Sequence, residues 1–275
     1  MGAQQSRSRS GESRPSGQHL LRSSSLAREL VAQAGIAADD LVVEAGAGTG
    51  RITEALAATG ARVVAIELDP LFANILRRRF EARSNVAVIE GDVLQVPMPS
   101  APFRVFGNIP FALTTAILRR LLDDPTSPLR RADLIVQYEV GRKRASVWPS
   151  TLASLGWLPW WEFSLSRRLP AAAFEPPPAV DAGILSITRR SPQLLVPWQR
   201  RDYLSLVQDG FRRGDLPVTR SLRHRIPERA WKRLARERGI APQAKARDLD
   251  VFDWVALFKM ARTATSRALP ARPHG

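Results

Sequence analysis

Short apolar runs alternate with amphipathic segments along the first two thirds of the chain. Seven of these runs have the length and the Val, Ile and Leu content of strands, at residues 41–46, 61–68, 86–90, 103–107, 132–140, 157–169 and 180–188. The first two runs are apolar nearly throughout, which is typical of parallel strands that are covered on both faces. The pattern therefore predicts an α/β fold with a seven-stranded, mostly parallel sheet.

Helical patterns fill the connections between these runs, and residues 70–79 provide an example. Pro70 is favourable at the first position of a helix. From the apolar spacing we expect Leu71, Ile75 and Leu76 to face the sheet, with the arginines that follow in solvent.

The pattern of predicted elements changes after residue 190. Three helical patterns follow one another there, at residues 198–211, 227–238 and 249–262. The first residues are rich in Ser, Arg, Gly and Pro and show no apolar periodicity, which is typical of disorder. The sequence thus predicts four segments: a disordered basic tail (1–16), an α/β domain (17–190), a small basic helical domain (191–263) and a flexible tail (264–275).

The net charge of the chain indicates what kind of partner it binds. The 275 residues carry a formal net charge of +15 and a pI of about 11.5, which favours a polyanionic partner. The absence of cysteine excludes disulfides and thiolate metal sites, and with only three histidines we expect no metal centre. No apolar run approaches the roughly 20 residues of a membrane span, and the N-terminus lacks the apolar core of a secretion signal, so we expect a cytoplasmic protein without membrane contact.

A glycine-rich turn follows the first predicted strand in the stretch LVVEAGAGTGR, residues 41–51. Glycines at Gly46, Gly48 and Gly50 accept positive φ and let backbone N–H groups approach a ligand closely. The spacing is tighter than the dinucleotide fingerprint, and the lysine of a P-loop is missing. Taken alone, the turn leaves the kind of nucleotide open.

Two acidic residues end the next two predicted strands. Glu67 and Asp92 follow the glycine turn at intervals of about 20 and 25 residues. Ligands of open α/β sheets bind at the carboxyl ends of the strands. One carboxylate there accepts the hydroxyl hydrogens of a ribose, and the other accepts from an adenine amine. Together with the turn they predict a site for a cofactor that contains adenosine.

The stretch Asn108-Ile109-Pro110-Phe111 ends the fourth predicted strand. The residue types of this stretch suit an adenine N6 amine that must attack an electrophilic carbon. Such an amine is a poor nucleophile because its lone pair is delocalised into the ring. The Asn108 oxygen and a backbone carbonyl near Ile109 are placed to accept its hydrogens. Pro110 fixes the turn, and Phe111 offers a face on which an extruded base stacks. Methyl transfer from a sulfonium needs mainly positioning, so the lack of an evident catalytic serine, histidine or metal agrees with it.

The motifs GQHLL, EAGAGTG, AIELDP, GDVL, GNIPF and FEPPPAVDAGIL occur in the order and spacing of the rRNA adenine N6-methyltransferases, and the chain most resembles the Erm enzymes. The resemblance implies a Rossmann-like class I methyltransferase fold and S-adenosylmethionine as cofactor. It also implies N6-methylation of a specific adenosine in 23S rRNA, with macrolide–lincosamide–streptogramin B resistance as the result. Residues 17–190 become the catalytic domain and residues 191–263 an RNA-binding domain. The expected partner is 23S rRNA, before or during ribosome assembly, and the expected state is a monomer.

The resemblance also implies individual roles. Around the methionyl part of the cofactor it places Gln18, His19, Leu21, Gly46 and Gly48. Glu67 is assigned to the ribose, Asp92 and Val93 to the adenine, and Asn108 to Phe111 to the target base, with Asn108 also beside the cofactor. The chain departs from the family at His19, where QHLL replaces the usual QNFL.

Three other readings share parts of this pattern. Small-subunit rRNA adenine N6,N6-dimethyltransferases more often carry NLPY and GPGLG, whereas NIPF and GAGTG here favour the Erm side. An N6-adenine DNA methyltransferase usually has a second proline in its motif. A non-catalytic RNA-binding protein on the same fold tolerates loss of Glu67, Asp92 or Asn108, and all three are present.

Overall fold

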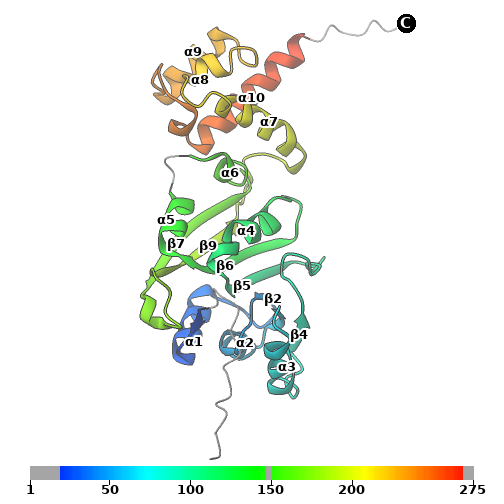
Figure 1. Ribbon diagram of the computed structural model, residues 1–275. Coiled ribbons are helices and arrows are strands. Elements are labelled where there is room, and N and C mark those ends of the chain that lie inside the picture. The colour runs from blue at the N-terminus through cyan, green and yellow to red at the C-terminus, as the bar shows by residue number, and fades with distance from the viewer. Residues whose placement is uncertain (1–18, 147–149, 269–275) are drawn as a thin grey trace, which may run out of the picture.

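A computed structural model describes residues 19–146 and 150–268, so the predicted tail at 1–16, Gln18 and most of the tail at 264–275 lie outside the described residues. Seven strands form one sheet in the order β4-β3-β2-β5-β6-β9-β7 (Figure 1). Their bounds are β2 Leu41–Ala45, β3 Arg62–Glu67, β4 Val86–Glu90, β5 Phe103–Asn108, β6 Leu129–Gln137, β7 Trp161–Leu169 and β9 Ala182–Arg189. The strands from β4 to β6 are parallel to their neighbours, and β9 is antiparallel to β6 and β7. The seven-stranded, mostly parallel sheet is confirmed.

Helices cover both faces of this sheet. The helices of the α/β part are α1 Ser24–Ala34, α2 Arg51–Ala57, α3 Pro70–Arg79, α4 Thr114–Leu122, α5 Tyr138–Ala145 and α6 Leu152–Leu155, with short 3-10 turns η1 Phe111–Leu113 and η2 Ala171–Ala173. Apolar residues of α1 and α2 pack with Val42 and Val63, whereas those of α4 pack with Val43 and Val105 on the opposite face. Successive side chains of β2 point to opposite faces of the sheet and thus pack into two separate core layers.

Two predicted strand boundaries are wrong. The run at 132–140 is a strand only as far as Gln137, after which α5 begins at Tyr138. The run at 157–169 becomes a strand only at Trp161. Trp157 and Trp160 precede it in a turn and are buried, because they fill the core beyond the end of the sheet. Apolar periodicity alone does not distinguish such a buried turn from a strand.

The prediction for α3 is also partly wrong. Leu76 is buried as expected, but Leu71 and Ile75 are 61% and 52% exposed. The helix packs through Ala73, Leu76 and Phe80 instead. These three residues lie on one stripe, because positions three and four apart share a helix face.

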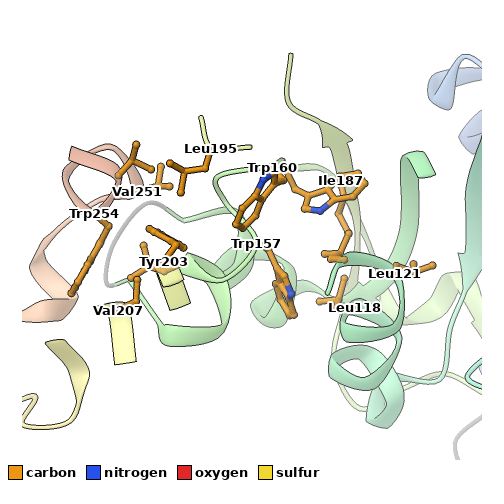
Figure 2. Packing of buried hydrophobic residues seen from close by; sticks show 14 of the residues in the cluster. Leu118, Leu121, Trp157, Trp160, Ile187, Leu195, Tyr203, Val207, Val251 and Trp254 are labelled. Carbon is orange, nitrogen blue, oxygen red and sulfur yellow. The ribbon is translucent and has the colours of Figure 1, made fainter. Parts of the chain in front are cut away.

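The helical region after residue 190 is confirmed as the second part of the fold. It comprises η3 Pro197–Gln199, α7 Arg200–Phe211, α8 Val218–Ser221, α9 Glu228–Arg238, η4 Ala246–Asp248 and α10 Val251–Ala268. Its core joins that of the sheet. Figure 2 shows Trp157 and Trp160 between Leu118 and Leu121 on one side and Tyr203 and Val251 on the other. The shared core fixes how the helical region sits on the sheet. No helix of the described ranges is long and apolar enough to cross a membrane.

A short second sheet lies outside the main one. Its strands are β1 Leu20–Leu21 and β8 Phe174–Glu175, which run antiparallel. The last two residues of the motif GQHLL form β1, which pairs with a strand of the Pro-rich connector between β7 and β9.

Candidate active site

The glycine turn and Glu67 form one hydrogen-bonded unit. Gly46, Gly48 and Gly50 all have positive φ, between 54° and 81°. The Gly48 N–H donates to Glu67 Oε2 at 2.7 Å, and the Asp69 N–H donates to Glu67 Oε1 at 2.9 Å. Glu67 is only 1% exposed. Its carboxylate therefore fixes the turn against the end of β3, while each oxygen keeps a further acceptor position.

The strand β1 covers this turn. A Cβ added at Gly48 would lie 2.7 Å from Leu20 Cδ2, so a side chain there would require the end of the Leu20 side chain to shift. The cleft that remains has a volume of about 30 Å³. It is lined by His19, Leu20, Gly46, Gly48, Asn108, Ile109, Pro110 and Phe111. Segments that are far apart in the sequence thus meet at the carboxyl edge of β2 and β5.

Asn108 is oriented by the same segment. Its Nδ2 donates to the His19 carbonyl oxygen at 2.6 Å, which leaves the amide oxygen as an acceptor. Asn108 is the last residue of β5, and Phe111 opens η1 three residues later. Thr114 Oγ1 donates to the Phe111 carbonyl at 2.9 Å and holds this turn in shape. The acceptor and the aromatic ring thus flank one cleft.

His19, the departure from the usual family motif, belongs to the site. Its Nδ1 lies 2.8 Å from the Pro176 carbonyl oxygen, and since a carbonyl only accepts, Nδ1 carries the proton. Its ring centroid lies 5.8 Å from that of Phe111, with the planes tilted by 38°. His19 therefore ties the covering segment to the Pro-rich connector and packs beside the aromatic ring.

Four of the predicted residues that the structure describes do not line the cleft, namely Leu21, Glu67, Asp92 and Val93. Leu21 is 4% exposed and packs with α1 and Phe174 in the core. Asp92 follows β4, where its Oδ1 accepts from the Leu94 N–H at 2.9 Å, and Val93 packs against the core. The Gly91 N–H donates to the Glu67 carbonyl at 2.8 Å, so Asp92 starts immediately beside the end of β3. It lies along the same sheet edge, one strand farther out.

The sequence pattern did not single out Glu44, whose environment is unusual for a carboxyl group. It is fully buried on β2, and its Oε2 accepts from Thr53 Oγ1 at 2.6 Å. Its Oε1 has no hydrogen-bond partner among the described residues. Burial raises the pKa of Glu44 from 4.5 to about 8, and the nearby Glu67 carboxylate adds to the rise despite the opposing Thr53 hydrogen bond. The sequence feature that could have drawn attention to Glu44 is its position as an acidic residue within an otherwise apolar strand, directly before the glycine turn.

The donors and acceptors present fit S-adenosylmethionine. Carboxylates at the ends of β3 and β4 suit a ribose and an adenine amine, and side-chain-free backbone at the glycine turn lets a ligand approach. Within the described ranges, no group of three or more His, Cys, Asp or Glu side chains is arranged to hold a metal ion.

Comparisons with known proteins extend these observations. The sequence pattern of the family described as ribosomal RNA adenine dimethylase matches residues 12–263. The mycinamicin-resistance protein MyrB of Micromonospora griseorubida is 40% identical over 233 residues, 84% of this chain and 73% of MyrB. A ribosomal RNA small subunit methyltransferase A of Synechococcus sp. (strain JA-3-3Ab) is 32% identical over 238 residues, 82% of this chain and 83% of its own. The crystal structure of the 23S rRNA methyltransferase ErmE has a TM-score of 0.79 at 26% identity, covering 88% of this chain and 99% of that chain.

The family match takes in the helical region as well as the sheet. The likeness is therefore not confined to the cofactor-binding half that many methyltransferases share. Because the match spans both the sheet and the helical region, the chain belongs to the ribosomal RNA adenine dimethylase family and is an S-adenosylmethionine-dependent rRNA adenine methyltransferase.

Proposed function

We propose that this chain methylates N6 of one adenosine in 23S rRNA and thereby confers macrolide–lincosamide–streptogramin B resistance. The observation that carries the proposal is the placement of Asn108. Its amide nitrogen is fixed on the His19 carbonyl, so its oxygen is presented as an acceptor beside the Phe111 ring and the glycine turn.

Cofactor binding is assigned to the turn and the two strand-end acids. We assign Glu67 to the ribose hydroxyls, since its carboxylate retains acceptor positions after bonding to Gly48 and Asp69. Asp92 and Val93 are assigned to the adenine, because they lie one strand farther along the edge. Gln18, His19 and Leu21 are assigned to the segment that closes over the methionyl part, with Leu21 anchoring this segment in the core.

The target base is assigned to Asn108–Phe111. When bound, S-adenosylmethionine supplies an electrophilic methyl group on its sulfonium sulfur. The Asn108 oxygen accepts one N6 hydrogen of the adenine and favours a tetrahedral nitrogen whose lone pair points away from the ring. A backbone carbonyl near Ile109 accepts the other hydrogen. Phe111 stacks on the extruded base, which contributes on the order of 1–3 kcal/mol.

Large-subunit rRNA is preferred over small-subunit rRNA for two reasons. A relative named for mycinamicin resistance is 40% identical, against 32% for a relative named as a small-subunit enzyme. The motif NIPF and the turn GAGTG also favour the Erm side. The small-subunit activity is the second candidate, because its relative matches this chain over a similar length.

We further propose that the chain acts as a monomer in the cytoplasm, on rRNA before or during ribosome assembly. The support is steric: the target base must leave its stack to reach an acceptor at the end of β5, and naked or partly assembled rRNA permits this. The formal charge of +15 supports binding to the exposed phosphate backbone.

One experiment tests the function directly. Protein-free 23S and 16S rRNA are incubated separately with the protein and labelled S-adenosylmethionine, and the labelled nucleotide and its methyl count are mapped. We expect label at one adenosine of 23S rRNA. Label in 16S rRNA alone selects the second candidate, and label in neither refutes adenine methylation.

A further inference from the structure

A cavity in the helical region is lined mainly by arginines. We call it the arginine cavity; its volume is about 220 Å³ and it lies between the end of α7 and α8. Its lining residues are Asp209, Arg212, Arg213, Arg220, Ser221, Arg223 and His224. Four arginines against one aspartate give this lining a formal charge of +3 when the histidine is neutral. Such a concentration of positive charge attracts an anion.

The single acid does not satisfy the arginines. Asp209 Oδ1 pairs with Arg212 at 3.0 Å, and its Oδ2 lies 3.2 Å from Arg225 and 3.6 Å from His224. The carboxylate is therefore already shared among three partners. Arg213, Arg220 and Arg223 are exposed and form no ion pair within the described ranges. Ser221 Oγ is buried in the same lining and has no hydrogen-bond partner there, so it is free to donate to an anion.

A second, apolar opening shares two of these arginines. We call it the apolar groove; its volume is about 840 Å³. It is lined by Thr219, Arg220, Arg223, Ile226, Glu228, Trp231, Lys232, Ala235, Arg236, Ile240 and Pro242. Arg220 and Arg223 therefore stand between a cationic cavity and an apolar one. A phosphate beside a flat apolar base is the chemical pattern of a nucleotide.

The charges of α9 behave differently. Lys232 pairs with Glu228 at 2.7 Å, and Arg233 lies 3.9 Å from Glu237, so two of the five basic residues of that helix have an acidic neighbour on the same helix. Other arginines without an ion pair in the described ranges, such as Arg201 and Arg229, line neither opening, whereas Arg213, Arg220 and Arg223 converge on one cavity. Planar guanidinium groups bind phosphate through two parallel hydrogen bonds.

We propose that the arginine cavity and the apolar groove together dock one stretch of single-stranded RNA, with a backbone phosphate in the cavity and an adjoining base in the groove. This inference rests on the proposed function, since the RNA is a part of the rRNA substrate. Helices α8 and α9 lie at the end of the molecule opposite α1 and α2 (Figure 1). The proposed site therefore binds RNA away from the adenine that is methylated. It contributes to the affinity for rRNA and not to the methyl-transfer step.

The test compares two triple variants of equal charge. The test variant is Arg213→Ala/Arg220→Ala/Arg223→Ala. The matched control is Arg201→Ala/Arg229→Ala/Arg233→Ala, which removes three exposed arginines of the helical region that line neither opening. Kd for protein-free 23S rRNA is measured by filter binding over a series of salt concentrations, and circular dichroism verifies that both variants fold.

We expect Kd of the test variant to rise roughly 10- to 100-fold at about 0.1 M salt, with a salt slope shallower by about one, since one phosphate contact is lost. The control should change Kd by less than about threefold, because scattered surface charges are screened. The kcat at saturating rRNA stays at the wild-type value in both. An equal rise in Kd for the two triple variants overturns the proposal. An unchanged Kd in both variants also overturns it, and this is the result expected if the cavity binds an acidic protein segment instead of RNA.

A third variant tests the groove without a charge change. Ala235→Leu keeps a strong helix former in α9 and fills the apolar lining. We expect Kd to rise about five- to tenfold, in line with the loss of one stacked base, at an unchanged salt slope. An unchanged Kd overturns the placement of a base in the groove. Filter binding requires no methyl transfer, so failure of the proposed activity is distinguished from failure of this site.

Discussion

Replacing Glu44 by glutamine should abolish a specific pH dependence of stability. Glu44 is fully buried, and burial raises its pKa from 4.5 to about 8 in the folded protein. Between these values the folded protein holds a proton on Glu44 that the unfolded chain has lost. Stability conferred by such a group is lost as pH rises, so the free energy of unfolding decreases. Glutamine keeps an oxygen that accepts from Thr53 and does not titrate.

The size of the effect follows from the shift. Each pH unit between the two pKa values lowers the wild-type free energy of unfolding by about 1.4 kcal/mol, or roughly 4 kcal/mol between pH 5 and pH 8. All other titrating groups are common to both proteins. The difference in the free energy of unfolding between wild type and Glu44→Gln therefore reports on this one carboxyl group. We expect the free energy of unfolding of the wild type to fall steadily relative to that of the variant as pH rises.

Urea unfolding of the free protein at several pH values measures this difference. A matched control is Glu54→Gln on α2, where the side chain is 40% exposed and the carboxylate pairs with Arg79 and Arg83. Exposed ion pairs contribute about 0–1 kcal/mol, so this control should show little change over the same range. A wild-type-minus-Glu44→Gln difference that is constant from pH 5 to pH 8 would refute a protonated, buried Glu44.

Three further predictions concern the methyl-transfer edge. Asn108→Ala should lower methyl transfer at least about 100-fold while calorimetry finds the affinity for S-adenosylmethionine little changed; equal methylation of rRNA contradicts the acceptor role. Phe111→Ala should cost about 1–3 kcal/mol in kcat/KM, and Phe111→Tyr, which keeps the ring, should cost much less; equal rates for both variants argue against stacking. Gly48→Ala should lower stability by about 1–3 kcal/mol because alanine is strained at φ 54° and meets Leu20. Gly214→Ala, at a glycine without positive φ, is the control, and an equal loss there contradicts the reasoning.

The sequence by itself determined the seven strands, the two-part organisation and the order of the motifs. These depend on local properties: apolar runs of strand length, glycines that permit positive φ, and prolines and arginines at helix ends. The sheet edge to which we assign the reaction was also predicted from the sequence, because the carboxyl ends of parallel strands lie together in any sheet of this kind.

Only the tertiary structure decided which distant residues meet. His19 contacts Pro176 across 157 residues of chain, and Leu20 closes over Gly48. Leu71 and Ile75 are exposed because α3 packs through a neighbouring stripe, a choice that its own periodicity leaves open. Trp157 joins two cores where the pattern indicated a strand. Such contacts depend on how whole elements pack, and packing is a property of the complete fold rather than of any one segment.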